Sequence, residues 1–129
     1  MKTILIAAIL FGTTSAFAGE RRDHIKLCNN LTAINSVSEL ELKSFQARDY
    51  KSISSTYMKV VLNQFLSNLS QVESLTNGKD ARVLLLRQDV LQELEETRIY
   101  DSYRLSTAAT IFKNIAVDTK SLLKSYSCL

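Results

Sequence analysis

The stretch LSTAATIFKNIAVDTKSLLKSY, residues 105–126, carries the most regular pattern in this chain. Its apolar and small residues recur at intervals of three and four, as one face of an α-helix requires. That face consists of Leu105, Ala108, Ala109, Phe112, Ile115, Ala116, Thr119, Leu122, Leu123 and Tyr126. We expect the helix to begin at Asp101 or Ser102. A helix with such a stripe must bury it against other elements, so this stretch predicts a helical bundle.

The residues just upstream predict another helix, over about 81–98. Asp80 ahead of it is a suitable N-cap residue. Asn77-Gly78 indicates the end of an earlier helix, because Gly readily adopts the left-handed conformation after a helix C-terminus. The run VLLL at residues 83–86 is apolar most of the way round, which is typical of a helix that lies centrally or at an interface. The stripe comprises Val83, Leu86, Val90 and Leu94.

The first half of the chain is expected to supply two more helices. Three-residue spacing predicts the first over residues 21–36, with Ile25, Cys28, Leu31 and Ile34 on one face. Ser38 and Glu41 have the spacing of a capping box, so a second helix is expected over residues 38–76. Residues 49–52, DYKS, form a weak point at which we expect this helix to bend. Its stripe comprises Leu42, Phe45, Ile53, Tyr57, Val61, Phe65, Leu69, Val72 and Leu75.

Composition points to the same class of fold. The chain has 129 residues with three Gly and no Pro, and 46% of its residues are hydrophobic. So little turn chemistry argues against a β-rich fold, and the apolar content argues against disorder. A net charge of +3, with dispersed basic residues, argues against a nucleic-acid partner. We therefore expect one all-α domain, a bundle of about four main helices.

Residues 1–18, MKTILIAAILFGTTSAFA, have the three parts of a secretory signal peptide. Lys2 is followed by an apolar run, and Ala16-Phe17-Ala18 places small residues before a cleavage site. We expect cleavage between Ala18 and Gly19, which leaves a single domain over residues 19–129. The apolar run is shorter than the ~20 residues of a transmembrane helix, so no span is expected after processing. The leader favours the periplasm, with a secreted protein as the alternative.

Two cysteines, Cys28 and Cys128, are expected to form one disulfide, because exported chains meet oxidising surroundings. In an up-down-up-down bundle, the start of the first helix lies beside the end of the fourth, as this pairing requires. A full reversal at residues 49–52 would add a fifth antiparallel helix and carry Cys128 to the wrong end. The expected disulfide is therefore the reason to predict a bend, and not a reversal, at that point.

Few residues suit catalysis or metal binding. His24 lies among basic residues near the expected mature N-terminus, and we interpret it as a surface residue. One His and two cysteines far apart in sequence do not make a zinc-site pattern, and no paired Glu-x-x-His motif is present. Ser121 and Lys124 have the Ser-x-x-Lys spacing but lack its companion motifs. We expect no cofactor, no metal and no catalytic residue.

Asp89, Glu93 and Glu96 share one face of the helix expected over residues 81–98, since they lie four and seven residues apart. Such a face can bind a cation or supply paired carboxylates. The interpretation that we favour is a solvated face whose repulsion is relieved by basic neighbours. Those neighbours would be Lys113, Lys120 and Lys124.

The sequence RIYDSYR, residues 98–104, connects the last two helices. Tyr and Arg are favoured at the energetic centres of protein interfaces, and a turn reaches the surface. Arg98, Tyr100, Tyr103 and Arg104 are therefore the candidate partner contacts. The alternative, which we favour, is that the apolar residues of the turn close the end of the core.

These observations favour a non-catalytic envelope protein that binds another protein, of the chaperone, pilotin or immunity and inhibitor type. One alternative is a structural protein that self-associates as a homo-oligomer through the apolar run at residues 83–86. Another is a small enzyme, which would require a cleft with convergent carboxylates.

Overall fold

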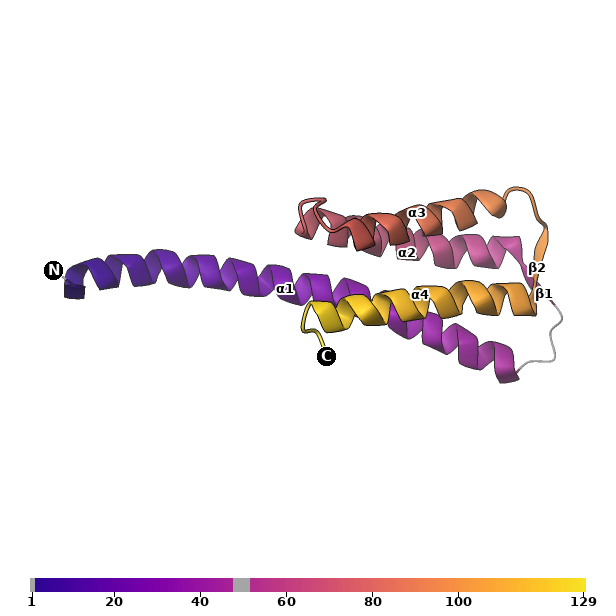
Figure 1. Cartoon of the computed structure of the whole chain (residues 1–129), viewed down its shortest axis with the longest axis horizontal. Helices are drawn as coiled ribbons and strands as arrows, with labels where there is room; N and C mark the ends of the chain where they lie inside the picture. Colours follow the sequence, from indigo (N-terminus) through magenta and orange to yellow (C-terminus); the bar gives the residue numbers. More distant parts are fainter. Residues whose placement is uncertain (1, 48–51) are drawn as a thin grey trace.

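The computed structural model describes the backbone of residues 2–47 and 52–129, and the side chains of residues 19–46 and 52–129. These residues form four helices and two short strands (Figure 1). The elements are α1 (Lys2–Ala47), β1 (Ser52–Ser54), α2 (Ser55–Leu75), α3 (Ala81–Glu96), β2 (Ser102–Arg104) and α4 (Leu105–Ser125). The predicted all-α bundle of four main helices is confirmed.

Successive helices run in opposite directions, and the first part of α1 projects beyond the other three helices (Figure 1). α1 packs most extensively on α4 and also on α2, and α2 packs on α3. Contacts between α3 and α4 are few. The bundle is therefore closed on three sides and loosest between α3 and α4.

Two helix boundaries in the first half were predicted wrongly, and the two errors compensate. α1 continues through residues 36–38, so Ser38 lies buried inside a helix and does not begin one. The chain reverses direction between α1 and α2, so residues 38–76 are not one bent helix. Residues 48–51, most of the expected weak point, lie outside the described residues. Because one expected break is missing and the expected bend is a reversal, the bundle still has four helices.

The reversal brings Cys28 of α1 beside Cys128, which follows α4, and the two form the predicted disulfide with a Cα–Cα distance of 5.4 Å. α1 also continues through residues 18 and 19 without a break in its backbone. Cleavage between Ala18 and Gly19 therefore stays a prediction. Within the described parts of the chain, no helix combines the length and apolarity that a membrane crossing needs.

The short ribbon of β1 and β2 was not predicted. The strands pair antiparallel, with Ile53 opposite Tyr103, and both of these side chains are buried. β2 occupies residues that we had assigned to the last helix, which begins at Leu105. Three-residue strands are too short for an alternating pattern to stand out in the sequence.

The core forms around Phe112 of α4. Its ring lies 5.6 Å from that of Phe45 in α1 and 6.1 Å, edge to face, from that of Phe65 in α2. The predicted stripe of α4 is buried or half-buried along its whole length. The stripe predicted for the first helix is wrong at Ile25, which is 49% exposed.

Asp80 closes the end of the bundle near the C-terminus. It is the predicted N-cap of α3, since its carboxylate accepts from the backbone N–H of Arg82 at 3.0 Å. The same carboxylate accepts the Tyr126 hydroxyl, and the Arg82 guanidinium donates to Ser125 Oγ at 2.8 Å. These bonds, led by that of the Arg82 side chain, hold the pKa of Asp80 well below its usual range. They join the start of α3 to the end of α4.

Candidate functional site

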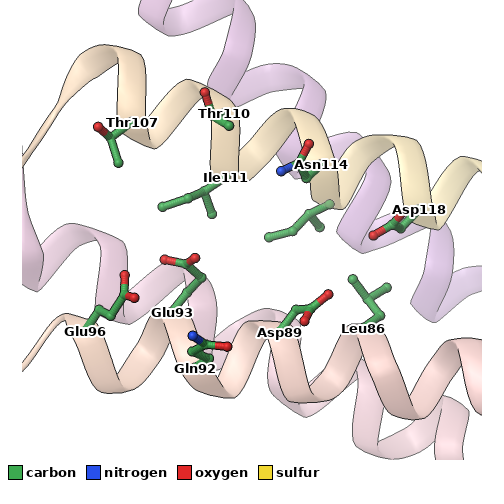
Figure 2. A pocket seen from close by; sticks show the side chains of 11 residues that line it. Leu86, Asp89, Gln92, Glu93, Glu96, Thr107, Thr110, Ile111, Asn114 and Asp118 are labelled. Atoms are coloured by element: carbon green, nitrogen blue, oxygen red, sulfur yellow. The ribbon is translucent and has the colours of Figure 1, made fainter.

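A groove runs between α3 and α4, on the loosest side of the bundle. Its central section has a volume of about 460 Å³. Leu86, Ile111 and Ile115 are the apolar residues that line this section, and polar side chains make up the rest of its lining. Figure 2 shows these side chains on the two helices. The polar side chains are the carboxylates of Asp89, Glu93, Glu96 and Asp118, the amides of Gln92 and Asn114, and the hydroxyls of Thr107 and Thr110.

Helix geometry explains why acids gather here. The apolar stripe of α3 packs into the core, and the predicted acidic face lies beside that stripe. Figure 2 shows Asp89 and Glu93 projecting from α3 toward α4. Asp118 of α4 lies one turn beyond Asn114 and completes the acidic lining from the opposite wall.

The lysines that we expected to relieve this repulsion do not do so. Lys113, Lys120 and Lys124 are exposed and do not line the groove. In the described parts of the chain, the ion pairs join Asp80 to Arg82, Glu73 to Arg87 and Glu95 to Arg98. The favoured interpretation of a solvated, compensated face is therefore wrong for Glu93 and Glu96, which are half-buried.

Among these acids, Glu93 has the pKa that departs most from its ordinary value. Burial, reinforced by the charges of Glu96 and Asp89, raises its pKa to about 7. Its Oε2 atom is buried and has no hydrogen-bond partner in the described structure. Burial and the charge of Asp89 also raise the pKa of Asp118. Burial and the neighbouring charges thus bring the titration of one groove carboxyl close to neutral pH.

A second pocket, of about 360 Å³, continues the groove at the β2 end. Glu96 and Thr107 line both sections, which makes them contiguous. Tyr103 lines this pocket and is only 4% exposed, yet its buried hydroxyl has no hydrogen-bond partner among the described residues. Burial, together with the charges of Glu93 and Glu96, raises the pKa of Tyr103. An unsatisfied buried hydroxyl costs free energy, which a ligand that bonds to it would recover.

Three of the four predicted contact residues meet in this pocket. Tyr100, Tyr103 and Arg104 line it, and the two tyrosine rings stack edge to face at 6.0 Å. Arg98 is not among the lining residues and pairs with Glu95 at 3.5 Å. The alternative, that the turn closes the core, holds only for Tyr103. Ile99 and Tyr100 are 75% and 54% exposed.

At the opposite end, Asp89 and Asp118 also line a smaller pocket of about 260 Å³. Arg82 lies there, as Arg104 lies in the pocket at the β2 end. Among the described lining residues, these two arginines are the basic ones, and neither lines the central section. The groove is therefore acidic in the middle and follows most of the length of α3.

The sequence pointed to three of the four acids but missed Asp118 and the groove itself. Asp118 is not part of a run of acidic residues, and the pattern that is visible in the sequence of α4 is its apolar stripe. Nothing in the spacing shows that α3 packs on α2 and leaves α4 uncovered on this flank.

This arrangement favours an elongated cationic ligand over a single metal ion. Among the described residues, three or more potential metal ligands come within chelating distance only at His24, Cys28 and Cys128, outside the groove. The groove carboxylates are spread along two walls instead. Comparison with protein-family models, curated proteins and solved structures found no match to this chain, so the groove is interpreted from its own residues.

Proposed function

We propose that this is an exported, non-catalytic protein that binds a basic segment of another envelope protein in the groove between α3 and α4. The observation that carries the proposal is the acidic lining: four carboxylates on two facing walls, with no basic side chain in the described central section. A partner that supplies Lys or Arg would provide the missing counter-charges.

The shape of the groove favours a protein segment over a small cation. α3 has 16 residues, so its flank is about 24 Å long. A basic helix of similar length could lie along this flank with its Lys and Arg residues against the carboxylates. Leu86, Ile111 and Ile115 are at most 8% exposed, so they would add little apolar contact. Nucleic acid is disfavoured, because its phosphates would meet the same negative charges.

The β2 end of the groove suits an arginine of the partner. A guanidinium can donate to a carboxylate with two parallel bonds, and it also stacks on aromatic rings. Glu96 and the exposed ring of Tyr100 line one pocket there, and the unpartnered Tyr103 hydroxyl is an acceptor beside them. Bound cations would also favour the charged form of Glu93, so binding would release protons near neutral pH.

Position-specific photocrosslinking in the producing cells tests this proposal. A photoreactive residue replaces Thr110, which lines the groove, or Thr32, an exposed threonine on α1 that serves as the matched control. We expect Thr110, and not Thr32, to yield a crosslink to a segment rich in Lys and Arg. The crosslink should weaken with added salt.

Charge variants then decide whether the acids matter. Glu93→Gln combined with Asp118→Asn should abolish the Thr110 crosslink, whereas Glu39→Gln combined with Glu95→Gln, at exposed positions, should not. The proposal is wrong if the crosslink survives neutralisation of the groove. It is equally wrong if Thr32 crosslinks as strongly, or if neither position captures a protein.

The convergent carboxylates also favour a second candidate, an acid–base enzyme. Glu93, whose pKa is raised to about 7, could act as a general acid opposite a second carboxyl group of the groove. Glycoside hydrolysis uses such a pair of carboxyl groups. Release of reducing ends from cell-wall glycan by the purified chain, lost in Glu93→Gln, would establish this alternative in place of the binding protein.

The apolar run at residues 83–86 exposes less surface for self-association than its sequence led us to expect. Val83 and Leu86 are buried, and Leu85 is the strongly exposed residue of that run, at 60%. Light scattering over a range of concentrations tests this alternative directly. A mass that stays at one chain would remove it.

A further inference from the structure

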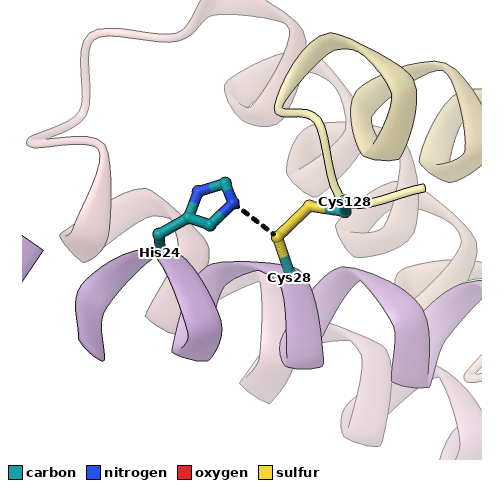
Figure 3. Close-up of side chains that lie close together, drawn as sticks. All are labelled: His24, Cys28 and Cys128. Carbon is teal, nitrogen blue, oxygen red and sulfur yellow. Dashed lines mark hydrogen bonds between the residues drawn. A yellow bond between two sulfur atoms is a disulfide. The ribbon is translucent and has the colours of Figure 1, made fainter. Parts of the chain in front are cut away.

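A second cluster lies at the end of the helical bundle opposite the β-ribbon (Figure 1). The His24 ring of α1 points at the disulfide, and its Nε2 atom lies 3.5 Å from Cys28 Sγ (Figure 3). The ligand atoms of His24, Cys28 and Cys128 all lie within 4.8 Å of one another. Cys128 is far from His24 and Cys28 in sequence, and the three do not match a zinc-site pattern, but the fold brings them together.

The positions of the three residues do not depend on the disulfide alone. His24 and Cys28 are one helical turn apart on the same face of α1. Beyond α4, the Cys128 backbone N–H donates to the Leu123 carbonyl at 2.8 Å. The hydroxyl of Tyr126 donates to Asp80, which fixes the start of this tail. These bonds tie the tail to α4 and to the start of α3 without help from the S–S bond, and α4 itself packs on α1.

We propose that the reduced form of this cluster binds a thiophilic metal ion of the Zn²⁺ class through His24 Nε2, Cys28 Sγ and Cys128 Sγ. Zn–S and Zn–N bonds of about 2.3 and 2.05 Å place a sulfur and a nitrogen about 3.5 Å apart in a tetrahedral site. The Nε2–Sγ distance of 3.5 Å already has this value. The two sulfurs must separate to about 3.8 Å. Cys128 Sγ, which lies within 4.8 Å of Nε2, must also come to about 3.5 Å from it.

The exposure of the cluster defines what kind of site it is. His24 is exposed and both cysteines are half-buried, so the fourth tetrahedral position faces solvent. A structural zinc site is closed by four protein ligands, whereas a site with three keeps one position for water or a substrate. The inferred site belongs to the second kind and does not rest on the proposed function of the groove.

The chemistry balances with a dithiol as reductant. The dithiol gives two electrons and two protons to the Cys28–Cys128 bond and becomes a disulfide itself, leaving two thiols in this chain. Zn²⁺ then displaces both thiol protons, forming two Zn–S bonds and one bond to neutral His24. Either state, disulfide or metal-bound, links α1 to the end of α4.

Metal titration of the full chain tests this inference. After reduction with a phosphine, which becomes the phosphine oxide, the chain is titrated without oxygen with Co²⁺ as a spectroscopic probe and with Zn²⁺ against a chromophoric chelator. We expect one ion per chain, sulfur-to-cobalt charge transfer and the intense visible bands of a tetrahedral site. The oxidised chain should show none of these signals.

His24→Ala is the decisive variant, with Asn29→Ala, an exposed position on the same helix, as its control. We expect His24→Ala to weaken Zn²⁺ binding about tenfold or more, with Asn29→Ala unchanged. Equal affinity in His24→Ala and the unsubstituted chain would overturn the site, as would failure of the reduced chain to bind. If the chain unfolds on reduction, circular dichroism measures whether Zn²⁺ restores the helical signal. Refolding by Zn²⁺ in the unsubstituted chain but not in His24→Ala supports the site. Absence of refolding in the unsubstituted chain overturns it.

Discussion

The two flanks of α4 differ in how the fold treats polar groups. Toward α1, Asn35 is buried, and its Nδ2 donates to the Ala116 carbonyl at 2.8 Å and to Thr119 Oγ1 at 3.0 Å. Toward α3, the groove holds Glu93, whose Oε2 is buried without a partner in the described structure. The neighbour on one flank, α1, thus buries neutral polar groups, the bonded amide of Asn35 and the hydroxyl of Ser38, which has no partner among the described residues. The neighbour on the other flank, α3, buries a carboxyl group that can carry a charge.

This difference separates stability from function. On the closed flank, the disulfide and the Phe45–Phe112 contact add to the bonds of Asn35. Each of these stabilises the bundle, and none needs a second molecule. The groove flank costs stability, because burial of Glu93 and the nearby charges of Glu96 and Asp89 disfavour its ionised form. A chain retains such a feature more readily when binding recovers the cost, which is why we place the function there.

Removing the disulfide should have the largest effect on the closed flank. The bond joins residues that are 100 positions apart, and chain entropy assigns a loop of that size about 4.7 kcal/mol. Cys28→Ser combined with Cys128→Ser should lower the free energy of unfolding by about 2–5 kcal/mol. Urea denaturation followed by circular dichroism measures the change. A loss below about 1 kcal/mol would show that packing alone closes this flank.

The closed flank is the part that the sequence predicted well. The stripe of α4 and the disulfide both follow from residues whose burial or chemistry leaves few choices. Phe112 and Leu123 are large apolar residues that must be buried, and the expected export of the chain favours a bond between its two cysteines. The position of the reversal was harder, because Ser38 and Glu41 match a capping box that the buried environment of Ser38 overrides.

The groove was predicted only in part, for a physical reason. The spacing of Asp89, Glu93 and Glu96 in the sequence is enough to show that they share one face of a helix. Whether that face meets water, lysines or another helix depends on which helices α3 packs against. Asp118 joins the site because α4 lies across the groove from α3, and single-sequence periodicity carries no information about that arrangement.

A second experiment tests the closed flank through its buried amide. Asn35→Ala removes two hydrogen bonds and should lower the free energy of unfolding by about 2 kcal/mol. The same substitution at Asn29, exposed on the same helix, should change it by less than about 0.5 kcal/mol. Thermal or urea unfolding of both variants gives the comparison. Equal stabilities would mean that Asn35 adds nothing to this flank.

The smallest change in the free energy of unfolding is expected for a substitution on the groove flank. This substitution should stabilise the chain, whereas those on the closed flank destabilise it. Since the pKa of Glu93 is raised from 4.5 to about 7 in the folded state, the folded chain binds more protons than the unfolded chain between these pH values. The contribution of Glu93 is therefore most favourable below pH 4.5 and is lost as pH rises to about 7. Asp118, whose pKa is also raised, adds a slope of the same sign.

Glu93→Gln should flatten this pH dependence and stabilise the chain at pH 8 by about 1 kcal/mol, a value reduced for solvent screening. Glu95→Gln, at an exposed position on the same helix, is the matched control and should leave the slope unchanged. Urea titrations at several pH values measure both slopes. If Glu93→Gln destabilises the chain at pH 8, or retains the full slope, then Glu93 is compensated in solution. The contrast between the two flanks of α4 would then disappear, and with it the argument for a cationic ligand.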